Sequence, residues 1–249
     1  MPKHPDYRAH WAAAGYELPM GSEEVCLPPP RDFVRVYHLT SAEHALTAIA
    51  LGRLKVARIS ELNDPFEFLA LNLKGEHRRK VMRDNKAALD RTHGILCFSR
   101  DWMNPVLWSH YGDRHRGICL GFNLRRSRAE VINYDVERVR QELDGDRSSL
   151  RLTKDQQLLL RRTKFAHWDY EGEQRLFVEL GQSTQEGSLF FWNFDEDLVL
   201  AEVVLGPDCH LPLDRVRGFV DALYANAVTF KGRPGVKRFE VVRNEATVP

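Results

Sequence analysis

The sequence lacks several features that would assign a protein to a class at once. It has no apolar stretch near the roughly 20 residues that cross a bilayer, and polar residues interrupt its first segment. No membrane span or signal peptide is therefore predicted, and a cytoplasmic protein is expected. Lysine and arginine (36) nearly balance aspartate and glutamate (35), which leaves a formal net charge of +1. No bulk field favours nucleic acid or an anionic membrane, so such a partner must be inferred from a local pattern.

Familiar catalytic and metal motifs are also absent. The sequence contains no phosphate-binding glycine loop, no G-x-S-x-G elbow, no internal repeat and no low-complexity tract. The few cysteines have no C-x-x-C spacing, so buried reduced thiols are expected rather than zinc ligands or disulfides. These cysteines are Cys26, Cys97, Cys119 and Cys209. What remains is a chain with 43% hydrophobic residues, enough for a globular core.

Hydrophobic periodicity and turn residues predict an α+β fold with a mixed, mainly antiparallel sheet core and flanking helices. Residues 1–31 are punctuated by glycine and proline and predict an N-terminal extension, helical only over 9–15, before a single domain over 32–249. Strands are predicted over 33–39, 54–59, 94–99, 117–123, 131–136, 198–205, 227–231 and 237–242. Helices are predicted over 42–51, 75–91, 106–112, 150–165 and 213–225.

The central stretch runs from Trp168 to Arg175 and precedes the apolar run Leu176-Phe177-Val178. Its two carboxylates, Glu171 and Glu173, are separated by one glycine, so an extended backbone would point both to the same side. Arg175 continues this row and would offset part of their repulsion. A carboxylate pair at the entrance of a strand suits a reacting sugar or a metal ion. The alternative is a solvated loop edge with an ordinary ion pair.

Other candidate positions precede this stretch. His38 is predicted at the end of a strand beside a helix N-terminus, where ligands bind in sheet–helix folds, or as a hydrogen-bonded structural residue. Residues 63–67 (Asn-Asp-Pro-Phe-Glu) predict a turn or a helix cap. Aromatic and imidazole side chains then gather over 102–115, and they suit a flat ligand with polar edges or, alternatively, a core rim. They are Trp102, Trp108, His110, Tyr111 and His115.

Four separated motifs resemble a large bacterial domain family of unknown function that is associated with phage-defence and toxin loci. They are 63–67 (NDPFE), 97–99 (CFS), 108–120 around Trp-Ser-His-Tyr, and 168–175 (W-x-Y-E-x-E-x-R). The resemblance extends over about residues 33 to 242 and specifies no chemistry. An antitoxin or a phage protein is the kind of partner that it implies.

A predicted strand with His38 precedes a helix that ends at Gly52, a later strand ends in Ser99 before a helix with Tyr111, and a Glu-x-Glu motif opens a further strand. This order resembles, more weakly, the ADP-ribosyltransferase fold. It implies that His38 hydrogen-bonds the ribose of NAD, Ser99 supports the nicotinamide pocket, Tyr111 stacks on the nicotinamide and Glu173 is catalytic. Further cofactor-binding positions on this reading are Tyr37, Trp108 and Arg175. Two positions depart from the pattern, because no glycine follows His38 and residues 97–99 (Cys-Phe-Ser) match only loosely the usual Ser-Thr-Ser.

This chemistry would explain the paired acids. Cleavage of the nicotinamide–ribose bond passes through an oxocarbenium-like state, which a fixed carboxylate such as Glu173 stabilises while it holds the ribose 2′-hydroxyl. Glu171 would then orient or deprotonate the acceptor. Protein, nucleic acid, small molecule and water all stay open as acceptors, and no membrane partner is expected.

Two alternatives belong to other classes. In the first alternative, four acidic side chains bind Mg²⁺ in a metal-dependent nuclease, and they are Asp64, Glu67, Glu171 and Glu173. The near-neutral net charge argues against a phosphate groove. The second alternative is a module that senses a nucleotide or a phage protein without chemistry, although such a binder has little use for paired carboxylates.

Overall fold

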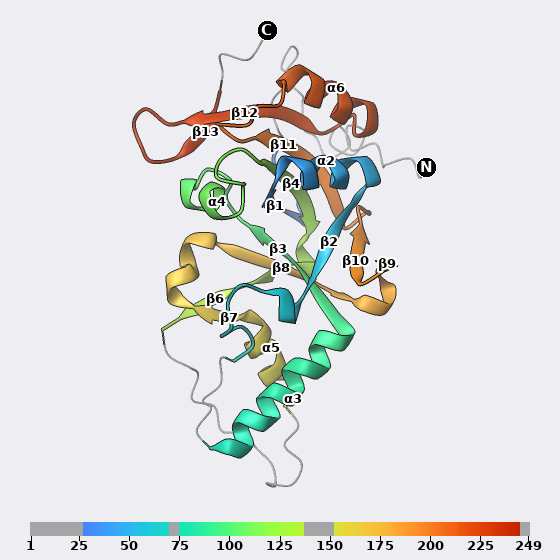
Figure 1. Ribbon diagram of the computed structural model, residues 1–249, viewed down its shortest axis with the longest axis vertical. Helices are drawn as coiled ribbons and strands as arrows, with labels where there is room; N and C mark the ends of the chain where they lie inside the picture. Colours follow the sequence, from blue (N-terminus) through green and yellow to red (C-terminus); the bar gives the residue numbers. More distant parts are fainter. Residues whose placement is uncertain (1–26, 70–74, 137–151, 245–249) are drawn as a thin grey trace. The chain divides into compact units, whose positions relative to one another are not determined.

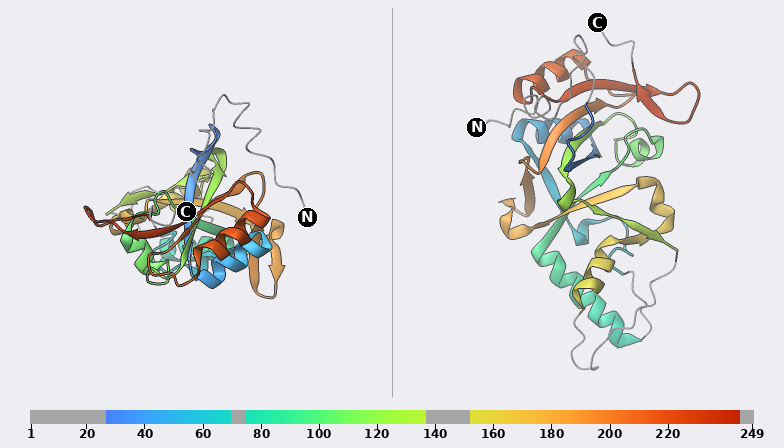
Figure 2. Two further views of the ribbon diagram at one scale, coloured as in Figure 1. Left: turned by 90° about the horizontal axis from the view of Figure 1, so that it is seen from above. Right: turned by 180° about the vertical axis from the view of Figure 1, so that it is seen from behind.

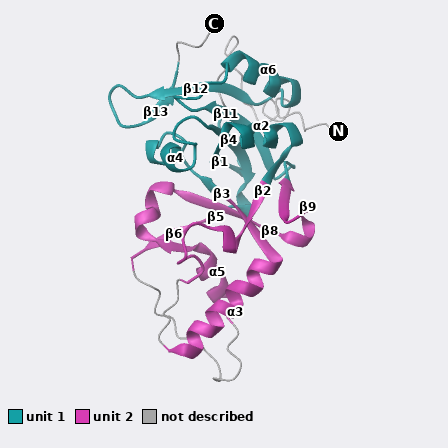
Figure 3. Cartoon of the chain, in the orientation of Figure 1, with its two compact units in different colours: residues 1–54, 98–129, 193–249 teal, residues 55–97, 130–192 magenta. Residues whose placement is uncertain are grey.

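The computed structural model (Figures 1 and 2) describes residues 27–69, 75–136 and 152–244. Its chain divides into two compact units, shown in Figure 3. Unit 1 consists of Met1–Leu54, Phe98–Ala129 and Asn193–Pro249, and unit 2 of Lys55–Cys97 and Glu130–Trp192. The predicted helix over 9–15, most of the predicted extension over 1–31 and Cys26 lie outside the described residues.

Unit 1 is built on a mixed sheet in the order β13-β12-β11-β4-β1. Its strands are β1 (Phe33–Thr40), β4 (Ile118–Arg125), β11 (Leu198–Leu205), β12 (Val228–Pro234) and β13 (Val241–Arg243). Only β11 and β12 pair in parallel, and the other neighbours pair antiparallel. The helices of this unit are α2 (Ala42–Leu51), α4 (Pro105–His110) and α6 (Leu213–Leu223), with a 3-10 turn, η2, over Arg126–Arg128.

The sequence explains the central elements of unit 1. All eight residues of β11 are buried, as the continuous apolar run of a central strand requires. Helix α2 begins after Ser41, whose hydroxyl accepts a hydrogen bond from the backbone N–H of His44. It ends at Gly52, whose φ of 64° is the left-handed conformation that glycine adopts without a steric cost. The predicted helix over 42–51 is therefore confirmed.

Unit 2 holds shorter strands around a β2-β3-β8-β5 arrangement. Its strands are β2 (Arg53–Arg58), β3 (His93–Ser99), β5 (Glu130–Val131), β6 (Asn133–Asp135), β7 (Thr163–Phe165), β8 (Glu173–Glu179), β9 (Thr184–Glu186) and β10 (Leu189–Asn193). Three of them, β2, β3 and β10, have end residues that belong to unit 1. Strands β6 and β7 pair in parallel, whereas β9 and β10 pair antiparallel. The helices are α3 (Glu76–Thr92) and α5 (Lys154–Arg162), and the 3-10 turns are η1 (Ile59–Glu61), η3 (Ala166–Glu171) and η4 (Leu180–Gln182).

One apolar cluster of unit 2 packs β8 against the segment after β2. Ile59, Phe68 and Ile95 are buried together. The ring of Phe68 meets that of Phe177 edge to face, with centroids 6.2 Å apart. This contact joins the segment that carries Glu67 to the strand that carries Glu173. It explains how acids more than 100 positions apart come to lie in one place.

The prediction of an α+β fold with mixed, mainly antiparallel strands and flanking helices is confirmed. Some boundaries were wrong. The strand predicted over 237–242 begins only at Val241, because the residues before it form the connection from β12. The helix predicted over 150–165 ends at Arg162, where Thr163 turns to an extended conformation and enters β7. The sequence reasoning did not predict β9 and β10.

Candidate functional site

The segment around Glu171 and Glu173 differs from the extended backbone that the sequence predicts. Residues Ala166–Glu171 form the 3-10 turn η3, and Gly172 follows in the left-handed region with φ 50° and ψ 43°. Strand β8 begins only at Glu173. A left-handed residue redirects the chain sharply, and glycine adopts it at no steric cost. The two acids therefore come together through a turn rather than through the alternation of a strand.

Lys164 lies at the point where the acids meet. Its Nζ lies 2.5 Å from Oε2 of Glu171, 3.1 Å from Oε2 of Glu173 and 3.5 Å from Oε1 of Glu67. The four side chains are between 2% and 7% exposed, so solvent screens their interactions little. The sequence did not identify Lys164 as a site residue, because it follows Arg161 and Arg162 and looks like part of an ordinary basic helix end.

Arg175 binds two of the same carboxylates. Its Nη1 and Nη2 donate to Glu67 over 3.0 and 2.7 Å, and its Nε and Nη2 donate to Glu173 over 2.7 and 2.9 Å. Such paired donation uses the planar fork of the guanidinium, which a lysine cannot reproduce. The predicted pairing of Arg175 with Glu173 is confirmed. Its side chain is only 1% exposed, so it has almost no surface to offer a cofactor.

We call Glu67, Glu171, Glu173, Lys164 and Arg175 the carboxylate cluster. Three carboxylates face two cations, so with every member ionised the cluster has a charge of −1. Burying a charge costs free energy unless a partner compensates it. The cluster therefore gathers more buried carboxylates than an ordinary structural ion pair does.

The pKa directions of Glu173 and Lys164 favour their charged forms. Burial alone would raise the pKa of Glu173, but Arg175 and then Lys164 outweigh burial and lower the pKa below its usual value. Burial would lower the pKa of Lys164, yet the charges of Glu173, Glu171 and Glu67 raise it, so the ammonium stays protonated. Burial, followed by the charge of Glu173, holds the pKa of the Cys97 thiol well above its usual value, so this partly buried cysteine stays a protonated thiol.

Tyr134 fixes the backbone at the start of β8. Its hydroxyl accepts a hydrogen bond of 2.7 Å from the backbone N–H of Glu173. Burial raises the pKa of this phenol to about 12, although the bond from Glu173 acts in the opposite direction. The hydroxyl therefore stays neutral at physiological pH and holds Glu173 in position.

An aromatic pair adjoins the cluster. The ring centroid of Trp168 lies 5.0 Å from Nζ of Lys164, a cation–π distance, and the rings of Trp168 and Tyr170 are 6.1 Å apart. Both side chains are partly exposed. They sit on η3, the turn that ends in Glu171, so a flat ring that stacks on them would lie next to the acids.

The remaining predicted cofactor-binding residues belong to unit 1, whereas Glu171, Glu173 and Arg175 belong to unit 2. Tyr37 lies directly opposite Ser99 in the antiparallel pair, so their side chains share one face of the sheet. His38 points to the opposite face, where its ring lies 6.0 Å from that of Phe98. One pocket over that sheet cannot use both His38 and Ser99.

The two aromatic residues predicted around α4 differ in what they offer. Trp108 is fully buried, and its Nε1 donates to the carbonyl of Trp102 over 2.6 Å, so it is part of the core. Tyr111 is partly exposed at the C-terminal end of α4, and its backbone N–H donates to Leu107. Of the two, only Tyr111 has surface on which a ligand could stack.

Unit 1 has a buried ionic centre of its own, which we call the Arg35 pair. Arg35 forms a salt bridge with Glu202, and its Nε donates to Oδ1 of Asn123 over 2.9 Å. The side chains of Arg35 and Glu202 are 12% and 7% exposed. Oε2 of Glu202 has no hydrogen-bond partner among the described residues, and a Cβ at Gly121 would approach it to 3.2 Å. Glycine at 121 therefore makes room for the carboxylate.

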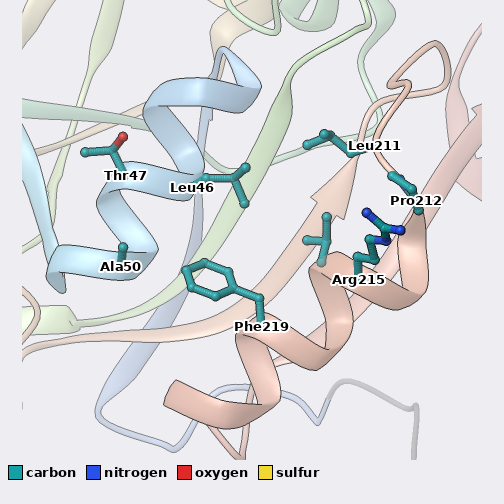
Figure 4. Close-up of a pocket in the computed structure, with 8 residues that line it drawn as sticks. Leu46, Thr47, Ala50, Leu211, Pro212, Arg215 and Phe219 are labelled. Carbon is teal, nitrogen blue, oxygen red and sulfur yellow. The ribbon is translucent and has the colours of Figure 1, made fainter.

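A groove of about 490 Å³ lies between α2 and α6 of unit 1. Figure 4 shows Leu46 and Phe219 pointing into it from the two helices. Its lining is mainly apolar and includes none of the predicted site residues. The complete lining is Leu46, Thr47, Ala50, Leu211, Pro212, Arg215, Val216 and Phe219.

The described residues contain no group of three or more His, Cys, Asp or Glu side chains arranged to hold a metal ion. The acids of the carboxylate cluster surround an ammonium group instead, and Asp64, the fourth acid of the Mg²⁺ alternative, accepts a bond of 2.9 Å from the backbone N–H of Phe66. None of the helices in the described part of the chain is long and apolar enough to cross a membrane. Comparisons with family models, with curated proteins and with solved structures found no match to this chain.

Proposed function

We propose that the carboxylate cluster is the reaction centre of an ADP-ribosyltransferase-like enzyme that breaks the nicotinamide–ribose bond of NAD, a transferase or a glycohydrolase. The observation that carries the proposal is the gathering of three buried carboxylates around Lys164 and Arg175, next to a partly exposed aromatic pair. Burying three carboxylates so close together costs free energy that a structural salt bridge does not require. A site that binds a cation, or that stabilises a cationic transition state, gains from carboxylates held in this way.

The chemistry of NAD matches these carboxylates. Its nicotinamide ring is flat and cationic, so it would be attracted to the cluster while it stacks on Trp168 and Tyr170. When the C1′–N bond breaks, the electron pair leaves with nicotinamide and neutralises its ring. Positive charge then develops on the ribose as an oxocarbenium-like state, which a negative site stabilises more than the ground state.

The two acids of the motif have different roles in this proposal. Glu173 is held by Arg175, Lys164 and the strand, so it is a preorganised negative charge that needs no reorientation during the reaction. Glu171 ends the turn that carries the aromatic pair, and it accepts the proton of the attacking acceptor. Water as the acceptor gives free ADP-ribose, and another nucleophile gives an ADP-ribosylated product.

The test is release of nicotinamide from NAD by wild-type protein and by Glu173→Gln and Glu171→Gln. Loss of a positioned electrostatic group lowers the rate by about a hundred- to a thousandfold, which is the effect expected for Glu173→Gln. Glu179→Gln is the matched control, because Glu179 lies at the exposed end of the same strand and should leave the rate unchanged. A thermal melt of each variant confirms that it is folded.

The proposal fails if folded wild-type protein releases no nicotinamide from NAD, or if Glu173→Gln is as active as wild type. A parallel melt with Mg²⁺ addresses the nuclease alternative. A metal-dependent reaction at the same acids would be favoured if Mg²⁺ raises the melting temperature, NAD does not, and no nicotinamide is released.

A further inference from the structure

The connection between β12 and β13 carries the most exposed apolar side chains in the described part of the chain. Phe239 is 101% exposed and Val236 is 88% exposed. In Figures 1 and 2 this connection extends beyond the other strands of unit 1. A single exposed apolar residue needs no explanation, but two at one hairpin tip form a small surface that folding has not buried.

The root of the hairpin is firmly held. Gly232 pairs with Arg243, and Pro234 pairs with Val241 across the two strands. Val241 is 2% exposed, and its backbone N–H donates to the carbonyl of Met103 over 2.7 Å. The tip is closed by a bond of 2.7 Å from the N–H of Gly235 to the carbonyl of Glu240. The exposed side chains are thus presented on a fixed support.

The hairpin is also strongly basic, although the whole chain has a net charge of only +1. Between positions 231 and 243 there is one acid, Glu240, and there are five cations. The cations are Lys231, Arg233, Lys237, Arg238 and Arg243. Lys237 and Arg238 are exposed at the tip, and no carboxylate of the described residues pairs with either. Two uncompensated cations therefore precede the exposed ring directly.

We propose that this hairpin binds single-stranded nucleic acid, with Phe239 stacked on a base and with Lys237 and Arg238 on adjacent phosphates. Single-strand binders combine a positively charged track for the backbone with aromatic rings on which bases stack, because every base has a π-face. Cations next to a fully exposed ring provide both elements within three residues. The inference does not depend on the reaction proposed for the carboxylate cluster.

A membrane surface fits the same hairpin less well. Its apolar area is confined to Val236 and Phe239, whereas one whole acyl chain holds a protein at a membrane only marginally. One ring is sufficient for stacking, because a single base–aromatic contact already changes affinity measurably. The charge complementarity therefore favours a polyanion with aromatic bases over an anionic bilayer.

The experiment measures fluorescence anisotropy of a labelled oligothymidylate titrated with the full-length protein at several salt concentrations. Wild type is expected to bind, with an affinity that falls as salt rises. Phe239→Ala should weaken binding about tenfold because one stacking contact is lost, without changing the salt dependence. Lys237→Glu/Arg238→Glu should weaken binding more, and should reduce the slope of log K against log salt by about 1.4, or 0.7 for each phosphate contact.

The matched control is Arg79→Glu/Lys80→Glu on α3, which changes the net charge by the same amount at two exposed cations of unit 2. It should change affinity less than about twofold, since surface charge far from a contact acts only through a screened field. All these positions are exposed, and circular dichroism verifies that the variants are folded.

Three outcomes would overturn the proposal. The first is that the wild-type protein binds no oligonucleotide at low salt. The second is that the hairpin variants and the α3 variant lose equal affinity for the oligonucleotide. The third is binding to vesicles of anionic phospholipid, lost in Phe239→Ala, without binding to the oligonucleotide. Loss of binding in both hairpin variants, with the α3 control unaffected, is the result that supports it.

Discussion

The Arg35 pair of unit 1 and the carboxylate cluster of unit 2 are both buried ionic centres, but they differ in composition. The Arg35 pair joins one guanidinium to one carboxylate, with Asn123 as a neutral neighbour. The carboxylate cluster joins three carboxylates to two cations. Burial is similar in the two centres, so the difference lies in the number of carboxylates. The number of carboxylates that converge, rather than their burial, therefore distinguishes a candidate site from a structural pair.

The reason is energetic. A buried salt bridge is weak support for function, because many structural pairs are buried and compensated. A convergence of three carboxylates is different, since it lowers stability and persists only where it has another use. The carboxylate cluster is therefore expected to respond to substitution in a way that the Arg35 pair does not.

The largest effect is expected for removal of the cation. Arg175→Met takes the shared guanidinium from Glu67 and Glu173, whereas Arg35→Met takes it from the single carboxylate of Glu202. Breaking a buried pair costs about 3–5 kcal/mol of unfolding free energy, so Arg175→Met should reach the upper end of that range and Arg35→Met the lower. Urea unfolding of both variants provides the measurement. A smaller loss for Arg175→Met than for Arg35→Met would contradict the account.

Acid should weaken the carboxylate cluster through Glu173. The pKa of Glu173 is lower in the folded protein than its ordinary value of 4.5, so its charged form stabilises the fold. This contribution is present above the unfolded pKa, and it is lost as pH falls from about that value through the folded pKa. Urea midpoints measured from pH 7 downward should therefore fall less steeply for Glu173→Gln than for wild type. If the urea midpoints of wild type and Glu173→Gln fall equally with pH, Glu173 does not contribute to the loss of stability in acid.

A smaller effect is expected at Tyr134. Tyr134→Phe removes the acceptor of the Glu173 backbone N–H and should cost about 1 kcal/mol, as for one ordinary hydrogen bond. The pKa of Tyr134 is raised to about 12, so its share of stability is present below its ordinary pKa of 10 and is lost as pH rises toward 12. An ultraviolet titration follows the ionisation of the tyrosines, and the step near pH 12 should be absent in Tyr134→Phe. If that step is still present, it does not belong to Tyr134.

The sequence predicted the regular elements because their signals are local. Helix α2 has a serine cap and a terminal glycine, and the apolar run of β11 needs no partner to be recognised. The Glu171–Gly172–Glu173 spacing was ambiguous. It suggested a strand, although Gly172 is equally suited to the left-handed end of the turn that the chain adopts there.

The composition of the carboxylate cluster could be predicted only in part. Glu171, Glu173 and Arg175 lie within five residues, but Glu67 reaches them through a tertiary contact 108 positions away from Arg175. Lys164 gave no signal of its own, because a lysine after a helix is usually solvated. His38 and Ser99 lie on opposite faces of the sheet because Tyr37 pairs with Ser99, and neither motif specifies this strand register.

Comparing Glu171→Gln with Glu202→Gln by urea unfolding tests the carboxylate cluster most directly. Glu171→Gln removes one of three closely spaced carboxylates and keeps an oxygen that can accept from Lys164, so the unfolding free energy should be unchanged or raised. Glu202→Gln leaves Arg35 without its described carboxylate, and it should lose about 1.5–3 kcal/mol, as for a charged hydrogen bond. Equal losses in the two variants would mean that the third carboxylate of the cluster costs the fold no free energy, and would contradict the account.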